Sequence, residues 1–303
     1  MKRGLLARLR TNGVTYIVAA LILLLVVPLY QLLILNPTGF GQAESNAGAQ
    51  RYIAYLAWIS THMSPFLIDR TLLIIAFILL ISFPYALYRI IVAQEIMYQQ
   101  ELEEAEELED DEDDVEHDVE HDVEEVATDN AAMTAVNEGE EIASAEDGQL
   151  AMPEHAWRGK SFVVLAIWLS MIGLGIYLLG LVVSTGYLFI IGTSTANVAR
   201  ENVETYLPLL SIFTNTLGTG LLGMGALFFG AMIARTGKNL WPTSWVLFGY
   251  AGLFAGAIFC ISAVAVLSAP GIGQSTLTTL ATLVFAAWLL WLGIMLIRLQ
   301  AEA

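Results

Sequence analysis

The one stretch that matches a catalytic motif is a pair of histidines in an acidic segment. His117-Asp118-Val119-Glu120-His121 fits the H-x-x-E-H pattern of inverted zinc proteases, in which two histidines share a metal and a glutamate acts as base. The match arises from a tandem Val-Glu-His-Asp repeat in a polar tract, where no packed core would fix the ligands. We expect weak, accidental metal binding by His117 and His121, and neither catalysis nor a cofactor.

Other groups that could do chemistry are sparse. The sequence has no nucleophile elbow, no phosphate-binding loop and no paired catalytic carboxylates. The single cysteine, Cys260, lies in an apolar block and excludes a disulfide framework. Asp69 is separated by whole predicted helices from Glu201 and Glu204, and we interpret each of the three as a solvated loop charge. The sequence therefore favours a protein that is not an enzyme.

Long apolar segments recur along the chain, so any functional site must be positioned by the helices that they form. Of the 303 residues 56% are hydrophobic and only 14% are charged, and the apolar ones are concentrated in blocks of about 20 residues or more. A helix of that length crosses the hydrocarbon of a bilayer and satisfies its own backbone hydrogen bonds. The sequence predicts an all-α integral membrane protein, in contact with the lipid bilayer, with about six transmembrane helices at 14–35, 71–92, 162–190, 208–234, 244–268 and 275–297.

The acidic residues are gathered in one segment. Between Glu95 and Glu154 lie 25 of the 30 acidic residues and no Lys or Arg. We expect this linker (residues 94–157) to begin as a helix and then to be disordered, because like charges repel and apolar residues are few. It could dock a basic cytoplasmic protein or a membrane complex, or trap cations. Nucleic acid is excluded as a partner, because the linker would repel phosphates.

The distribution of basic residues predicts the orientation. Ten of the 13 Lys and Arg residues fall on one side of the predicted spans, while Arg51, Arg70 and Arg200 fall on the other. Basic residues are retained on the cytoplasmic side, so both termini and the linker are expected there. This gives a 2 + 4 arrangement: a transmembrane hairpin (1–93) with a short interfacial helix on the outer side (51–69), the acidic linker (94–157) and a four-helix bundle (158–303).

Small and polar residues recur in two of the predicted spans. No Asp, Glu, Lys or His falls near the middle of any span, which disfavours a proton-driven transporter. Residues four apart with small side chains favour close helix packing, although the polar ones could instead line a cavity between helices. The residues concerned are Asn215, Thr216, Thr219, Gly220 and Gly223 in the fourth span, and Gly252 and Gly256 in the fifth.

The stretch GALFFGAMIARTGKNLWPTSWVLFGYAGLFAGAIFCIS, from Gly225 to Ser262, joins two apolar helices by a short basic turn with a Trp-Pro start. It loosely resembles families of bacterial polytopic membrane proteins of unknown function. The resemblance covers under a sixth of the chain. It implies a bacterial cytoplasmic membrane as the location and implies no activity.

Three functions remain open from the sequence. The first is a non-enzymatic membrane subunit or scaffold, which assembles through its glycine faces and presents the acidic linker to a cytoplasmic partner. The second is a channel or facilitator for a small neutral solute through the four-helix bundle. A membrane-associated, metal-dependent enzyme is the third and rests on His117 and His121 alone.

Overall fold

The structure is a computed structural model and describes residues 3–45, 49–96, 98, 154–193, 203–268 and 276–299. Every regular element within these ranges is helical. Six helical segments are long and apolar enough to cross a membrane: Ala7–Thr38, Met63–Ile96, Ser161–Thr193, Val203–Gly237, Thr243–Ser268 and Thr276–Arg298. The prediction of an all-α integral membrane protein with six spans is confirmed. Most of the acidic linker, including His117 and His121, lies outside the described residues.

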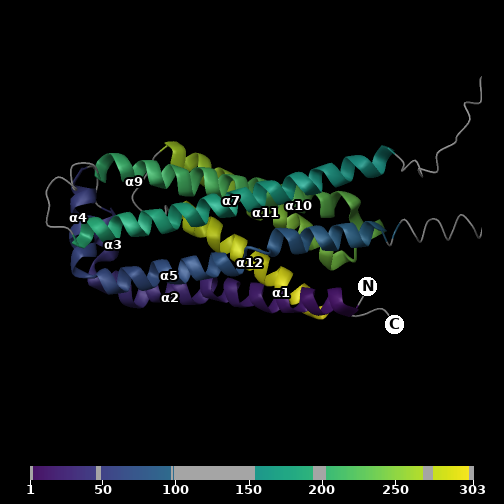
Figure 1. Ribbon diagram of the computed structural model, residues 1–303, viewed down its shortest axis with the longest axis horizontal. Helices are drawn as coiled ribbons and strands as arrows, with labels where there is room; N and C mark the ends of the chain where they lie inside the picture. The colour runs from purple at the N-terminus through teal and green to yellow at the C-terminus, as the bar shows by residue number, and fades with distance from the viewer. Residues whose placement is uncertain are drawn as a thin grey trace, which may run out of the picture.

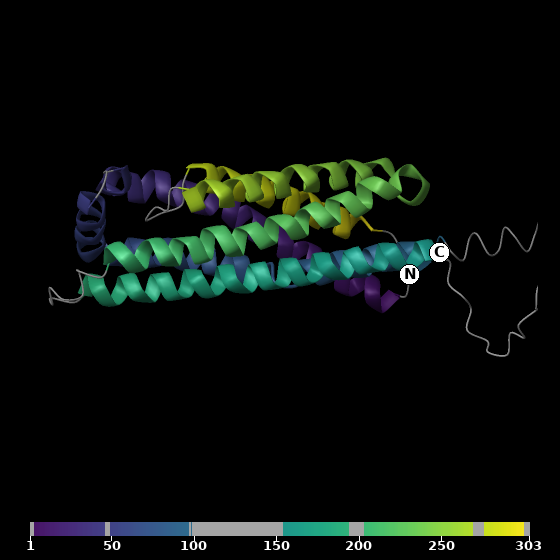
Figure 2. The ribbon, with the colours of Figure 1, turned by 90° about the horizontal axis from the view of Figure 1, so that it is seen from above.

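The six spans lie side by side in an elongated bundle (Figure 1). Both chain termini are at one end of it. At the opposite end the short helices α3 (Phe40–Ser45) and α4 (Ala49–Thr61) connect the first two spans, and α4 lies across the span ends (Figure 2). We call this the α4 end. Of the residues 51–69 predicted as one helix, those up to Thr61 belong to α4 and a separate helix begins at Met63. The position of this segment at a membrane interface stays a prediction.

Span 1 is a continuous helical rod with two wide turns. It consists of α1 (Arg3–Leu21), a π-helical segment η1 (Ile22–Val26), α2 (Val27–Tyr30), a second π-helical segment η2 (Gln31–Leu35) and a 3₁₀ turn η3 (Asn36–Thr38). Pro28 lies in α2 between the two π-helical segments, and its missing N–H prevents a regular α-helical ladder there. The rod ends at Gly39, whose φ of 89° suits a residue without a side chain.

Span 2 begins earlier than the sequence predicts. Helix α5 (Met63–Leu79) starts eight residues before Thr71, and Pro65 lies in its first turn, where a proline is tolerated. The helix is interrupted at residues 80–82, just before Pro84, and then continues to Ile96. In the interruption the Ser82 hydroxyl lies 2.9 Å from the Tyr16 hydroxyl of span 1, so the two spans are hydrogen-bonded at the kink.

The remaining spans form antiparallel pairs. They are α7 (Glu154–Thr193), a composite of α9 (Val203–Ser211), η4 (Ile212–Gly218) and α10 (Thr219–Leu240), then α11 (Thr243–Ser268) and α12 (Thr276–Arg298). Pro208 was expected at the start of the fourth span but lies inside α9, because the helix begins at Val203. Its position in the second turn costs only one backbone hydrogen bond close to a helix end.

Close approach of helix backbones holds the bundle together. Lipid chains are as apolar as leucine, so association of spans depends on packing and on small residues that let backbones meet. Span 1 and α12 meet at Gly13 and Gly293: a methyl group on Gly13 would lie 2.9 Å from the Gly293 carbonyl oxygen. The main core draws on all six spans, with Tyr16, Phe77, Tyr177, Phe229, Phe248 and Phe285 among its fully buried side chains.

Candidate functional site

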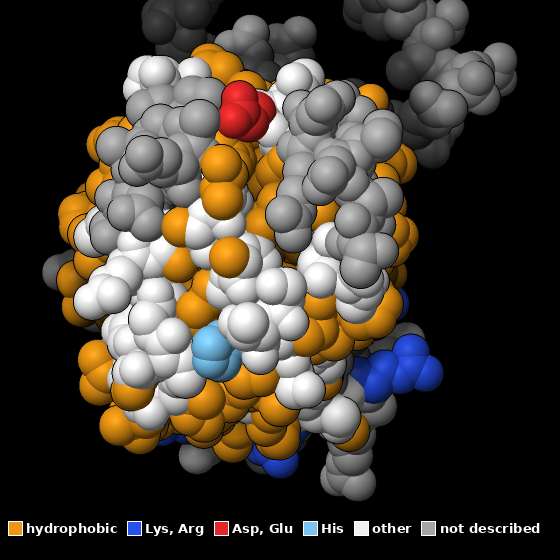
Figure 3. Space-filling view, turned by 90° about the vertical axis from the view of Figure 1, so that its left-hand side faces the viewer, with side chains coloured by type: hydrophobic (Ala, Val, Ile, Leu, Met, Phe, Trp, Pro, Cys, Tyr) orange, Lys and Arg blue, Asp and Glu red, His pale blue; other side chains and the backbone are white. Residues whose placement is uncertain are grey.

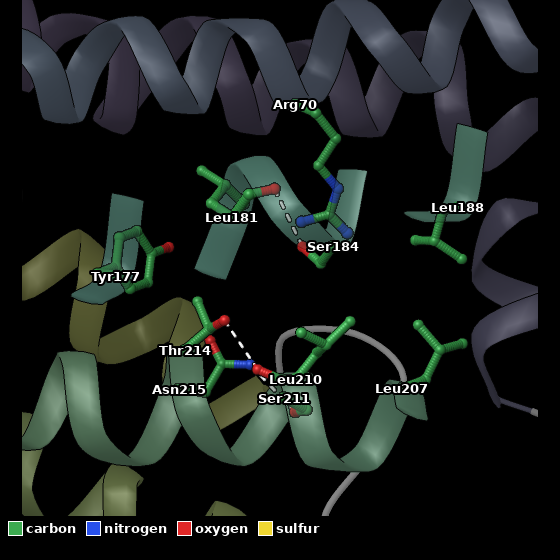
Figure 4. A pocket seen from close by; sticks show the side chains of 10 residues that line it. All are labelled: Arg70, Tyr177, Leu181, Ser184, Leu188, Leu207, Leu210, Ser211, Thr214 and Asn215. Atoms are coloured by element: carbon green, nitrogen blue, oxygen red, sulfur yellow. Dashed lines mark hydrogen bonds between the residues drawn. The ribbon is translucent and has the colours of Figure 1, made fainter. Parts of the chain in front are cut away.

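Polar side chains from three spans converge on a cavity near the α4 end. Its volume is about 40 Å³. The lining residues come from α5, α7, α9 and η4, and Figure 4 shows how they lie: Arg70, Tyr177, Leu181, Ser184, Leu188, Leu207, Leu210, Ser211, Thr214 and Asn215. We call this the Arg70 cavity. Arg70 is the only lining residue that carries a formal charge.

Arg70 reaches into the cavity from α5 and is held by two aromatic residues. Its guanidinium lies 5.3 Å from the centre of the Phe66 ring, within the range of a cation–π interaction. One guanidinium nitrogen donates to the Tyr55 hydroxyl of α4 at 3.4 Å, a long hydrogen bond. Tyr55 is fully buried in a second core cluster beneath α4. The helix across the bundle end therefore helps to fix the cation.

Asp69 lies beside Arg70 in sequence but points to another helix. Its side chain is only 3% exposed, and its carboxylate accepts a hydrogen bond from the Gln31 amide of η2 at 3.0 Å. The interpretation of Asp69 as a solvated loop charge is therefore wrong. The error has a physical cause: α5 begins at Met63, so both charges lie on a helix that packs against other spans. Arg70 and Asp69 use different sides of that helix.

The π-helical segment η4 presents the polar residues on the opposite side of the cavity. Wide π turns are rare and often occur at functional sites. Here Asn215 Nδ2 donates to Ser211 Oγ at 3.2 Å, and Thr214 Oγ1 donates to the Leu210 carbonyl at 2.8 Å. Asn215, Ser211 and Thr214 are all buried. Gly180 of α7 makes room for them, because a methyl group there would overlap the Thr214 hydroxyl.

The residues singled out in the fourth span separate into two groups. Asn215 lines the Arg70 cavity, together with its neighbour Thr214. Thr219 is buried and its hydroxyl donates to the Asn215 carbonyl. Thr216 faces α11 instead, where its hydroxyl donates to the Ala263 carbonyl at 3.2 Å. The structure thus brings Asn215 to the cavity and directs Thr216 into a helix contact.

The glycines singled out lie in contacts within the bundle. Gly223 and Gly256 face each other, since a methyl group on Gly256 would lie 2.6 Å from the Gly223 carbonyl oxygen. A methyl group on Gly220 would contact Ala263 at 3.4 Å, and one on Gly252 would lie 3.0 Å from the Trp288 ring of α12. These faces are occupied by helices of the same chain. They do not provide a free surface for a second protein.

Sequence reasoning missed the cation and its partners on α7. Arg70 was placed at a span boundary, and Ser184 and Tyr177 lie within a long apolar block that gave no reason to single them out. One signal was present for Arg70. The apolar run Phe66-Leu67-Ile68 precedes the charges and follows Pro65, a residue typical of a first helical turn. That pattern indicates a helix that starts before Asp69.

Nothing in the described part of the chain forms a metal site. No group of three or more His, Cys, Asp and Glu side chains comes together within those ranges. The predicted pair His117 and His121 lies outside them, so weak metal binding there stays a prediction.

Comparison with protein-family models, with curated proteins and with solved structures gives no match to this chain. The resemblance of residues 225–262 to bacterial polytopic membrane proteins therefore stays a prediction. What the protein does has to be argued from its cavity.

Proposed function

We propose that the protein is a non-enzymatic membrane protein that binds a small polar solute in the Arg70 cavity. The observation that carries this proposal is a guanidinium held in a cavity whose other lining residues are uncharged. A charged group inside a helix bundle is costly, and such groups commonly face a ligand or a water-filled cavity. Asp69 and Tyr55 offset only part of this cost for Arg70. The site differs from the predicted solute path, because Arg70 belongs to span 2 and not to the four later spans.

The size and depth of the cavity support a small solute that enters from water. Sites for drug-sized metabolites have volumes of roughly 300–1,000 Å³, far above the 40 Å³ found here. The longer spans, with 32–35 residues, measure about 50 Å at 1.5 Å per residue, whereas the hydrocarbon is about 30 Å thick. Arg70 lies seven residues into α5, which is close to the level where hydrocarbon begins.

For orientation, we propose that the α4 end faces outward. The arginines Arg8, Arg10, Arg89, Arg235 and Arg298 all lie toward the end that carries the termini. In the view from the α4 end, the described side chains are mostly hydrophobic or uncharged, with a histidine and an acidic side chain among them, and Lys or Arg side chains show only at the right and lower edges (Figure 3). Retention of basic residues in the cytoplasm supports this assignment. It places the acidic linker of the 2 + 4 arrangement inside, where its docking role as part of a membrane subunit stays a prediction.

A cysteine at Ser184 tests whether the cavity is polar and wet. In a background with Cys260→Ala, we expect iodoacetamide to alkylate the cysteine of Ser184→Cys at least roughly tenfold faster than a cysteine that faces lipid. A thiol beside an arginine ionises readily, whereas a thiol in lipid stays protonated. The measurement is the alkylation rate of protein in proteoliposomes, followed by mass spectrometry.

The matched control is Val182→Cys in the same background. Val182 lies two residues away on α7 and is 50% exposed on the outside of the bundle. Equal, slow rates for the two cysteines would contradict the proposed solute site.

The orientation has its own test. We expect a cysteine placed between Glu101 and Glu125, again with Cys260→Ala, to react with a membrane-impermeant maleimide only after the cells are permeabilised. A cysteine at Ser60, an exposed position on α4, is the opposite control and should react in intact cells. Labelling of the linker from outside would reverse the proposed orientation.

A further inference from the structure

We infer that the solute in the Arg70 cavity is a small monovalent anion of the size of a halide ion. This inference rests on the proposed function and names the class of ligand that the same site would take. It is carried by the charge balance of the cavity, by the direction of its hydrogen bonds and by its volume.

The charge balance of the lining is positive. Apart from Arg70 the lining consists of tyrosine, leucine, serine, threonine and asparagine side chains. The nearest carboxylate in sequence, Asp69, interacts electrostatically with Arg70 and accepts a hydrogen bond from Gln31 on span 1, but it is not part of the lining. Asp69 lowers the cost of holding a cation in the bundle, but it leaves the cavity side of the guanidinium without an opposite charge. An anion in the cavity would supply one.

Hydrogen-bond donors lie on two sides of the cavity: on the Arg70 guanidinium, and on Asn215 and Ser211 of the opposite helix. A guanidinium has five N–H groups, and in the described part of the chain one hydrogen bond of Arg70 is found, to Tyr55. Asn215 uses one amide proton on Ser211 Oγ, which leaves its second N–H and the Ser211 O–H able to donate. Arg70 and the Asn215–Ser211 pair approach the cavity from opposite helices (Figure 4). An ion between them would be met by donors from both sides.

Two further hydroxyls of the lining, those of Ser184 and Thr214, present lone pairs to the cavity. Ser184 Oγ donates to the Leu181 carbonyl at 3.0 Å, and Thr214 Oγ1 donates to the Leu210 carbonyl at 2.8 Å. With their protons used, these oxygens can only accept, which suits a water molecule next to the ion. The cavity thus has a donor part for an anion and an acceptor part for its hydration.

The volume suits a small anion. A buried water needs roughly 10–15 Å³, so a cavity of about 40 Å³ has room for a few water molecules. A halide with one or two waters therefore fits.

Halide-dependent stability tests the inference on the full-length protein in detergent. With sodium gluconate replaced by sodium chloride at constant ionic strength, we expect Tm to rise by about 3 °C between 1 and 100 mM chloride. Arg70→Gln should lose this rise. Arg89→Gln is the matched control and should keep it, because Arg89 also donates to a tyrosine hydroxyl, at 2.9 Å from Tyr85, and lies over that ring, but near the opposite end of the same span.

Bromide crystallography keeps the test independent of any variant. Crystals of the unaltered protein grown in sodium bromide should show an anomalous peak in the cavity beside the Arg70 guanidinium. Three results would each overturn the inference. They are a Tm that depends on which cation is present and not on the anion, a chloride response that Arg70→Gln retains, and a cavity that holds only water in the bromide crystals. If Ser184→Cys reacts fast and no halide effect is found, the polar site stands and only its anionic ligand is wrong.

Discussion

Replacing Gly230 by alanine is expected to lower the free energy of unfolding by about 2 kcal/mol, the usual range for overpacking a tight core. A methyl group on Gly230 of α10 would lie 2.6 Å from both the Gly249 carbonyl oxygen and the Leu253 amide nitrogen of α11. These are backbone atoms, so the two helices must separate to admit it. The measurement is unfolding of the purified protein by titration with sodium dodecyl sulfate.

Gly175→Ala is the matched control for this prediction. Gly175 also lies inside a long apolar helix, but a methyl group there would meet nothing within 4 Å. Alanine has the higher helix propensity, so this variant should be more stable by about 0.5–1 kcal/mol. If the two substitutions had the same effect, close backbone contact between α10 and α11 would not be what stabilises the pair.

Trp288→Ala should have a larger effect, a loss of about 3 kcal/mol, as is usual when a large aromatic residue is removed from a core. Trp288 of α12 is 2% exposed and stacks on Phe248 at a centroid distance of 5.0 Å. Its indole N–H also donates to the Phe248 carbonyl at 3.1 Å. The substitution therefore removes both the aromatic contact and the hydrogen bond that tie α12 to α11. The same detergent titration measures the loss.

The control is a tryptophan that faces outward. Trp168 of α7 is 63% exposed, so truncation to alanine removes contacts with lipid or detergent and leaves the core intact. We expect Trp168→Ala to change the free energy of unfolding by less than about 0.5 kcal/mol. A large loss in Trp168→Ala would show that this outer face of α7 is covered in the folded protein, contrary to the packing described above.

The spans could be predicted from the sequence because hydropathy follows directly from residue type. All six apolar blocks correspond to helices, with ends that differ by at most eight residues. Most of the differences arise because the helices continue past the apolar residues. The predicted 14–35 became Ala7–Thr38, for example, since Arg8, Arg10, Thr11 and Asn12 extend the helix without interrupting it.

The start of span 2 could not be found by hydropathy alone. Charged residues usually mark the end of a membrane span, so the adjacent Asp69 and Arg70 were taken for its boundary. In the folded protein their cost is offset by contacts from distant segments, namely Gln31 of span 1 and Tyr55 of α4. Those contacts form only when distant segments pack together, so they could not be predicted from the sequence of residues 63–71 alone.

The cavity was only partly predictable for the same reason. Asn215 stood out because an amide is rare in an apolar block, and a polar cavity was one of the two interpretations given for it. Its partners Arg70 and Ser184 are separated from it by large stretches of sequence and meet it only when α5, α7 and η4 come together. The π-helical geometry of η4, which turns Thr214 and Asn215 toward them, also has no simple local signature.

The contact between the first and last spans constrains how the chain is made in the cell. Arg10 donates from its guanidinium to the Leu299 carbonyl at 2.6 and 3.2 Å, and Gly13 meets Gly293 along the same pair of helices. During synthesis, span 1 leaves the ribosome before the other five spans, and it can pair with α12 only after α12 has emerged. Its glycine surface would be uncovered until then. Insertase or chaperone contacts with span 1 are thus expected to persist until α12 is released.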